Sequence, residues 1–184
     1  MRACWSVLVL LASVSWSIAT PARQDDERLP ALFDTLLSAS TTEEARRVER
    51  YIWNIWTDSG REDVNRLMAR GIQAMTLRMF DVALESFDEV IELDPAFAEG
   101  WNKRATLYWL IDDLAKSMDD IQHTLALEPR HFGAISGMGL IFLERGDPSG
   151  ALQAFEAVLR INPQSLSAKV HVRQLRDLLQ GNSV

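Results

Sequence analysis

The sequence predicts an all-helical protein built from helix pairs stacked in a row, and three observations support this fold class. Pro95, Pro129 and Pro163 are spaced 34 residues apart, a period typical of helix-turn-helix repeats. Small residues recur at this interval, and so do large apolar residues four positions earlier. The matched sets are Gly71, Ala105 and Gly139 (small) and Leu67, Trp101 and Ile135 (large). Residues four apart share a helix face, so the small residue lets a second helix approach closely.

The composition fits one compact domain or a short repeat array. The chain has 184 residues, of which 47% are hydrophobic and 24% are charged, and its formal net charge is -7. A negative mean field repels a phosphate backbone, so we expect no nucleic-acid partner. The single cysteine, Cys4, lies in the apolar N-terminal segment.

Residues 1–19 have the pattern of a secretory signal peptide. Arg2 precedes an apolar run over residues 3–18, and small residues follow around Ala19, after which we expect cleavage. The alternative is a membrane anchor, but the run contains four serines and is shorter than the ~20 apolar residues of a spanning helix. We therefore expect no stable membrane span after cleavage. A mature chain without thiols suits the periplasm, and the polar residues 20–29 predict a flexible leader.

Residues 30–63 predict a helical pair with the length of one repeat. Hydroxyl residues at 40–42, followed by Glu43 and Glu44, indicate the start of its second helix. Its first helix carries Phe33, Leu36 and Leu37, and its second helix carries Trp53 and Trp56. The places that are small or proline in the other copies hold Leu37, Glu49 and Arg61. We therefore expect helices here without the full repeat packing.

Three consecutive copies of the period cover residues 64–97, 98–131 and 132–165. The second helix of each copy carries an apolar stripe that one helix pair cannot cover alone, so neighbouring copies have to stack. The prolines end each second helix, because the ring cannot continue the hydrogen-bond ladder. Gly146, Asp147 and Pro148 predict the turn inside the third copy, with Ser149 as the cap of the next helix. Residues 166–181 predict an amphipathic helix that caps the last copy.

This pattern resembles the tetratricopeptide repeat over residues 64–165. The resemblance implies a right-handed helix-turn-helix array of three repeats with N- and C-terminal capping helices. Segments 52–56, 99–106 and 126–134 are similar to exported tetratricopeptide proteins of alphaproteobacteria. That similarity implies a periplasmic interaction protein that supports the cell envelope, and it implies no reaction.

Tetratricopeptide proteins typically bind peptides on the concave surface of their first helices, and the resemblance places ten residues of this chain there. They are Met68, Ile72, Met75, Asn102, Lys103, Thr106, Trp109, Ser136, Leu140 and Leu143. This predicted groove is mostly apolar and would seat an amphipathic helix or an extended segment of another protein. One branch of the family grips a C-terminal carboxylate with lysines and asparagines. The matching places here hold Met68, Ile72, Gly133 and Gly137.

Two other occupants of the groove remain open at this point. A terminal helix of the chain itself could fill it, which would make these side chains part of the core. Homodimerisation would also cover the apolar surface.

The sequence offers little for catalysis. It has no nucleophile-elbow, dinucleotide-binding or P-loop pattern, and no cofactor is expected. Asp119 and His123 share a helix face, but no third ligand completes a metal site. Arg104, Arg130 and His131 fall at repeat junctions, where we expect them to hydrogen-bond open carbonyls at helix ends.

The sequence thus predicts an exported, noncatalytic scaffold or adaptor for another protein or peptide segment. The first alternative is a periplasmic assembly or chaperone factor that holds exported clients. Saturable binding to one partner favours the adaptor, whereas binding of many unfolded clients favours the chaperone. A metal-dependent or hydrolytic enzyme is the weakest alternative.

Overall fold

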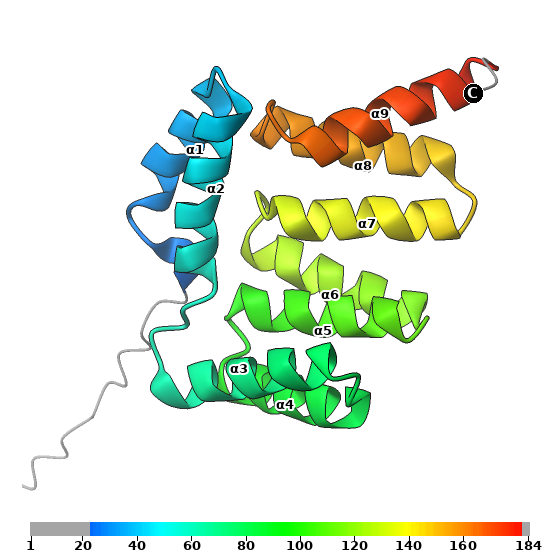
Figure 1. Cartoon of the computed structure of the whole chain (residues 1–184). Coiled ribbons are helices and arrows are strands. Elements are labelled where there is room, and N and C mark those ends of the chain that lie inside the picture. The colour runs from blue at the N-terminus through cyan, green and yellow to red at the C-terminus, as the bar shows by residue number, and fades with distance from the viewer. Residues whose placement is uncertain (1–22, 182–184) are drawn as a thin grey trace, which may run out of the picture.

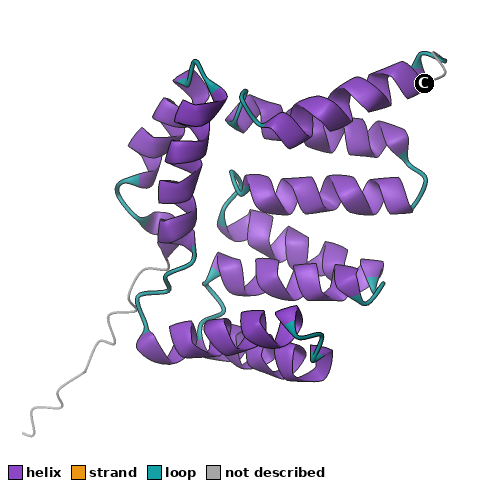
Figure 2. Cartoon of the chain, viewed as in Figure 1, coloured by secondary structure: helices purple, strands orange, loops and turns teal. Residues whose placement is uncertain are grey.

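The computed structural model describes residues 23–181, and this part of the chain contains helices and turns but no strand (Figure 2). A 3-10 turn at Arg23–Asp25 precedes the α-helices of this range. They are α1 (Leu29–Ser38), α2 (Thr42–Trp56), α3 (Glu62–Thr76), α4 (Phe80–Leu93), α5 (Ala98–Leu110), α6 (Leu114–Leu127), α7 (Phe132–Glu144), α8 (Pro148–Ile161) and α9 (Leu166–Leu179). The predicted signal peptide, residues 1–19, lies outside the described residues. Leu29 is fully buried and begins α1, so the end of the predicted leader at 20–29 belongs to the fold.

Six of these helices form three antiparallel pairs, α3 with α4, α5 with α6 and α7 with α8 (Figure 1). The pairs stack in chain order, and α9 packs on α8 at the end of the row. Each pair coincides closely with one copy of the 34-residue period, so the prediction of stacked helix pairs is confirmed.

A small residue opposite a large one sets how closely the helices of each pair approach. A Cβ atom added to Gly71 would lie 2.5 Å from Cε1 of Phe87, and one added to Gly139 would lie 2.9 Å from Cζ of Phe155. In the middle pair an isoleucine replaces the phenylalanine, and Ala105 takes the place of the glycine. In each pair the space that the large side chain needs is thus left by the small residue of the facing helix: glycine faces phenylalanine, and alanine faces isoleucine.

The turn inside each pair has one residue in the left-handed conformation, at positions that follow the 34-residue period. These residues are Arg78 (φ 58°), Asp112 (φ 65°) and Gly146 (φ 71°). In the first pair the N–H of Met79 donates to the carbonyl of Ala74 at 2.9 Å, and the other two pairs repeat this bond. This is a Schellman turn, which satisfies carbonyls at the end of a helix.

Side-chain caps fix several helix starts. Thr41 accepts a hydrogen bond from the N–H of Glu44 at 3.2 Å, and the Glu44 carboxylate accepts one from the N–H of Ser40 at 2.9 Å. This arrangement is a variant of the capping box, in which the carboxylate binds the N–H one residue before the cap. At α8 the cap is Asp147, which accepts from the N–H of Gly150 at 2.8 Å. The prediction of Ser149 as this cap is therefore wrong.

The N-terminal pair, α1 and α2, stands beside the row of pairs and does not continue it (Figure 1). Buried residues of both helices share one core cluster with Phe132, Ile135 and Phe155 of α7 and α8. The expected helices are therefore present without the packing of a further repeat. As Figure 1 shows, α2 crosses the ends at which α5 and α7 begin.

The N-terminal segment contacts all three loops that follow the second helices, at positions spaced by the period. Gln24 donates to the carbonyl of Ala96. The guanidinium of Arg130 lies 4.1 Å from the ring centroid of Phe33. Gln164 donates to the carbonyl of Ala39 at 3.3 Å. The N-terminal segment thus binds the edge of the array at which these three successive loops lie.

Candidate functional site

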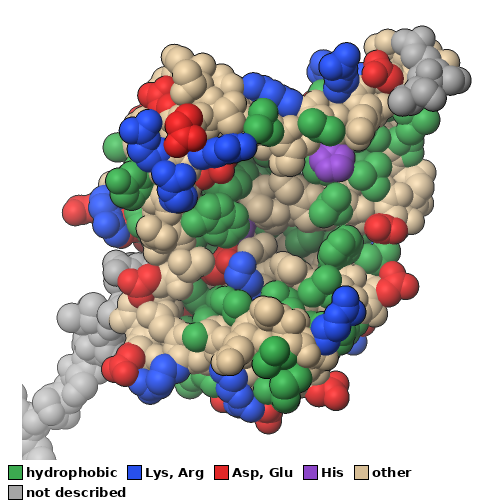
Figure 3. Space-filling model, viewed as in Figure 1, with side chains coloured by type: hydrophobic (Ala, Val, Ile, Leu, Met, Phe, Trp, Pro, Cys, Tyr) green, Lys and Arg blue, Asp and Glu red, His purple; other side chains and the backbone are tan. Residues whose placement is uncertain are grey.

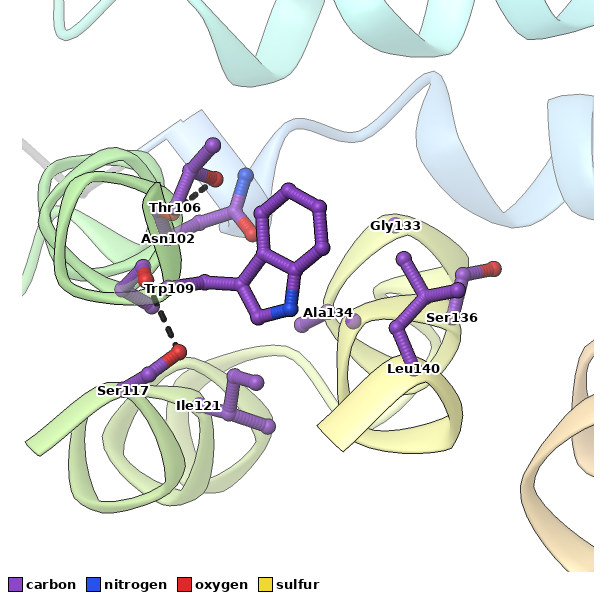
Figure 4. A pocket seen from close by; sticks show the side chains of 11 residues that line it. Asn102, Thr106, Trp109, Ser117, Ile121, Gly133, Ala134, Ser136 and Leu140 are labelled. Atoms are coloured by element: carbon purple, nitrogen blue, oxygen red, sulfur yellow. Dashed lines mark hydrogen bonds between the residues drawn. The ribbon is translucent and has the colours of Figure 1, made fainter. Parts of the chain in front are cut away.

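A pocket of about 230 Å³ opens between α5, α6 and α7 (Figure 4). It is lined by Asn102, Ala105, Thr106, Trp109, Ser117, Ile121, Gly133, Ala134, Ser136, Gly137 and Leu140. The face of the molecule in Figure 3 is hollowed near its middle, and hydrophobic side chains gather around the hollow. A volume of this size admits one large apolar side chain of a bound segment.

Small residues leave the space of the pocket, and one aromatic side chain forms a wall of it. Ala105 on α5 and Gly133, Ala134 and Gly137 on α7 contribute little side-chain volume. Trp109 is half-buried, and in Figure 4 its indole extends from α5 toward Ala134. The pocket is thus an apolar slot with a broad aromatic wall, the type of surface that forms binding hot spots.

The hydroxyl groups of the pocket already donate to the backbone. Thr106 donates to the carbonyl of Asn102 at 2.9 Å, Ser117 to that of Ala105 at 2.8 Å, and Ser136 to that of Phe132 at 2.8 Å. The oxygen atoms of the exposed Thr106 and the half-buried Ser136 can still accept hydrogen bonds from a ligand, whereas Ser117 is buried. Polar recognition in the pocket therefore favours a ligand that donates, as peptide N–H groups do.

Five of the ten predicted groove residues line this pocket. They are Asn102, Thr106, Trp109, Ser136 and Leu140. The other five lie elsewhere. Met68 is only 3% exposed and is a core residue of the first pair, against which the half-buried Met75 packs. Ile72 is exposed on α3, Leu143 packs on the core of the third pair, and Lys103 forms an ion pair.

The sequence does not predict the floor of the pocket. The period marks Ala105 as a residue for helix packing, and the family resemblance marks Gly133 and Gly137 as places without carboxylate-binding side chains. The signal for the floor is the group of small residues Gly133, Ala134 and Gly137 at the start of the third copy, because neighbouring small residues leave space that the period alone does not reveal.

A buried carboxylate lies next to the pocket. Glu99 of α5 is 1% exposed, and its Oε2 accepts hydrogen bonds from Nε2 of His131 at 3.0 Å and from Nδ2 of Asn102 at 2.8 Å. Nζ of Lys103 lies 2.8 Å from the other carboxylate oxygen. Nδ1 of His131 accepts from the N–H of Ala134 at 3.0 Å, which places the imidazole proton on Nε2.

The environment of Glu99 favours its charged form. Burial by itself raises the pKa of Glu99, but the hydrogen bond from His131 and the Lys103 ammonium outweigh it and hold the pKa below its ordinary value of 4.5. A charged, hydrogen-bonded Glu99 therefore joins α5 to the start of α7. This contact holds α5 and α7, on which most of the pocket residues lie, in a fixed position relative to each other.

α2 covers the junction that Glu99 and His131 form. Trp56 stacks on the imidazole of His131 with ring centroids 4.3 Å apart, and Trp53 meets the same ring edge-on at 5.4 Å. A Cβ added to Gly133 would lie 2.8 Å from Cη2 of Trp53, and Nζ of Lys103 lies 5.7 Å from the Trp53 ring centroid. The chain's own N-terminal pair therefore fills one end of the groove, while the pocket at Trp109 stays open.

The junction residues bind carboxylates, and the expectation that they hydrogen-bond helix-end carbonyls is wrong. Arg104 pairs with Asp88 and Asp120 at 2.6 and 2.8 Å, and Arg130 pairs with Glu128 at 2.9 Å. Arg61 takes the expected role, because it donates to the carbonyl of Leu93 at the end of α4, whereas Arg145 donates to the carbonyl of Leu114 at the start of α6. His123 stacks on Trp101 at 4.2 Å, and residues 23–181 contain no group of three or more potential metal ligands.

Fold and pocket together define a helical-repeat module with a slot for an apolar group. No family model matches the chain. A TPR repeat-containing protein of Rhizobium etli is 39% identical over 156 residues, which make up 85% of this chain and 76% of that protein. The chain therefore belongs to the tetratricopeptide-repeat family, and both the predicted family and the predicted fold class are confirmed.

Other relatives and solved structures agree with this assignment. The small glutamine-rich tetratricopeptide repeat-containing protein 2 of Saccharomyces cerevisiae is 26% identical over 71% of this chain and 39% of that protein. The crystal structure of MamA has a TM-score of 0.59 at 21% identity and covers 86% of this chain and 85% of its own. The first TPR domain of Spaghetti (RPAP3), bound to an HSP90 peptide, has a TM-score of 0.61 at 20% identity over 65% and 94% of the two chains. These structural likenesses show the fold.

Family membership supports a role as a scaffold for protein–protein interaction. None of the helices between residues 23 and 181 combines the length and the apolar character that crossing a membrane requires.

Proposed function

We propose that this protein is a noncatalytic adaptor that binds a segment of another protein in the pocket at Trp109. The observation that carries the proposal is an open apolar slot on a tetratricopeptide array, walled by an indole and floored by small residues. A large apolar side chain of the partner fills the slot, and the backbone of its segment donates to the hydroxyl oxygens at the rim. The RPAP3 domain, which has the same fold, is bound to a peptide in its solved structure, and this supports a peptide segment as the ligand.

The proposal includes export to the periplasm and a role in supporting the cell envelope. It rests on the signal-like residues 1–19 and on the similarity of three segments to exported proteins. Cell fractionation of a C-terminally tagged full chain tests the location. We expect the tagged protein in the periplasmic fraction with Thr20 as its first residue. A tagged protein that stays in the cytoplasm with residues 1–19 attached would contradict this part of the proposal.

In-cell photocrosslinking tests the binding role. A photoreactive amino acid is placed at Thr106 or Leu140, on opposite sides of the slot, and the crosslinked protein is identified. We expect one predominant partner, whose crosslink is lost when Trp109→Glu puts a charge into the slot. Leu110→Glu is the matched control, because Leu110 is exposed on the same helix and does not line the pocket.

The outcomes separate the adaptor from its alternatives. One partner, lost in Trp109→Glu and kept in Leu110→Glu, supports the adaptor. Many unrelated partners would favour the assembly or chaperone factor. A crosslink to a second copy of this chain would favour a homodimer. Crosslinks that survive Trp109→Glu, with the helical circular dichroism unchanged, would exclude the pocket as the binding site.

A further inference from the structure

We infer that the segment bound at Trp109 is acidic next to its apolar anchor, and that Arg47 and Arg50 of α2 bind its carboxylates. This inference rests on the proposed function and adds the chemistry of the partner. It extends the binding surface beyond the three repeats, onto a helix of the N-terminal pair.

Arg47 and Arg50 have no partner among the residues that the structure describes. Many other arginines of the described range do, including Arg61, Arg104 and Arg130. Both side chains are exposed, and they line a shallow depression of about 290 Å³ together with Tyr51, Trp53 and Asn54. Two adjacent unpaired guanidinium groups beside aromatic rings suit carboxylates, which guanidinium binds through two parallel hydrogen bonds.

The depression lined by Arg47 and Arg50 and the pocket at Trp109 meet at one side chain. Trp53 belongs to the depression, and its ring lies against Gly133, which lines the pocket. Figure 3 shows Lys and Arg side chains over α2, with Asp and Glu side chains among them, next to the hollow in this face of the molecule. A segment anchored at Trp109 that runs past Gly133 and over Trp53 therefore reaches Arg50 and Arg47.

Because the chain is negatively charged overall, these arginines are favoured positions for the acidic residues of a partner. The formal net charge is -7, so most of the surface repels an acidic segment. On the first helices of the repeats, the side chains of Met68, Ile72, Gly133 and Gly137 cannot bind an anion. Lys103 on α5 is already paired with Glu99. Acidic residues of the partner are therefore held at α2, and this fixes the direction in which the segment crosses the groove.

A displayed library of random dodecapeptides tests the inference. The library is selected on the exported protein produced from the full chain, and the peptides kept are those that no longer bind Trp109→Glu. We expect these pocket-dependent peptides to carry Asp or Glu near a large apolar residue. Arg47→Gln/Arg50→Gln should weaken their binding about five- to tenfold, as expected for two exposed ion pairs. Added salt should reduce this difference.

Two controls make the result specific. Arg160→Gln/Arg173→Gln removes the same charge from exposed sites on α8 and α9 and should leave the affinity unchanged. Replacing the acids of a selected peptide by amides should weaken binding to the native protein, with no further loss in Arg47→Gln/Arg50→Gln.

The failures of the two proposals can be told apart. Pocket-dependent peptides without acids, or with equal affinity for Arg47→Gln/Arg50→Gln, would overturn the inference and leave the proposed function standing. If no selected peptide depends on Trp109, the proposed function itself is wrong.

Discussion

At the scale of single residues, the least expected feature is a charged Glu99 inside the molecule. A buried carboxylate is tolerated only when its hydrogen bonds and charge are satisfied. Here Asn102 and His131 donate to one carboxylate oxygen, the Lys103 ammonium forms an ion pair with the other, and His131 also caps α7. One imidazole thus links the repeats to each other and, through its stacking on Trp56, to the N-terminal pair.

Glu99 gives the protein a pH dependence with a defined sign. Its folded-state pKa lies below 4.5, so the unfolded chain takes up the proton first as the pH falls. The stabilisation is complete at neutral pH and is lost below about pH 4.5. We expect Glu99→Gln to lower the free energy of unfolding at pH 7 by roughly 1.5–3 kcal/mol, the range for hydrogen bonds to charged groups. Denaturant titrations at several pH values check this.

The difference in free energy of unfolding between the native protein and Glu99→Gln should shrink as the pH falls below 4.5, because Glu99 of the native protein then becomes protonated. A difference that stays constant down to pH 3 would contradict the assignment of a lowered pKa to Glu99.

A second residue-scale prediction concerns the left-handed turn positions. A residue with a Cβ atom costs about 1–2 kcal/mol in this conformation, whereas glycine adopts it readily. Arg78→Gly should therefore raise the free energy of unfolding by about 0.5–1 kcal/mol. Gly146→Ala is the matched opposite, because no heavy atom lies within 4 Å of the added Cβ and only the backbone conformation opposes it. Urea denaturation of both variants measures the effect, and destabilisation by Arg78→Gly would refute the argument.

At the scale of helices, the match between small and large residues decides how each pair packs. Gly71→Ala places a Cβ against the ring of the fully buried Phe87. We expect a loss of roughly 1–3 kcal/mol from this overpacking. Adding Phe87→Ile recreates the combination found in the middle pair and should recover part of the loss. A double-mutant cycle measures the coupling, and purely additive effects would show that the two sites are independent.

The period in the sequence predicted the three pairs because every copy buries the same helix faces. It could not reveal Arg78 and Asp112 as left-handed positions, because only the third copy has the glycine that marks such a turn. The pocket was predicted in part. Trp109 was identified from its place on the first helix, whereas the floor consists of side chains that are small.

At the scale of the whole molecule, the orientation of the N-terminal pair could not be predicted. Trp53 and Trp56 fall at the places that Phe87 and Val90 hold in the first copy, so the period would pack them within their own helix pair. In the structure they pack on the start of α7. The arrangement depends on long-range contacts with His131, Phe132 and Gly133. Contacts of this kind leave no local pattern in a sequence.

The core contact of the N-terminal pair leads to a prediction for the whole molecule. Trp56→Ala removes the ring that stacks on His131 and should lower the free energy of unfolding by roughly 3–5 kcal/mol. Hydrogen exchange should then rise first in α1 and α2, while α3 to α6 keep their protection. Tyr51→Ala is the control, because Tyr51 is 57% exposed on the same helix. A uniform rise across all helices would show that the pair does not open separately.

The three loop contacts of the N-terminal segment also restrict how this protein can evolve. An open solenoid can lengthen when one unit is duplicated, since each unit touches only its neighbours. Here Gln24, Phe33 and Ala39 reach Ala96, Arg130 and Gln164 in turn, so one more unit in the middle would separate these partners. The length of the segment from Gln24 to Ala39 thereby limits the number of repeats whose loops it can contact.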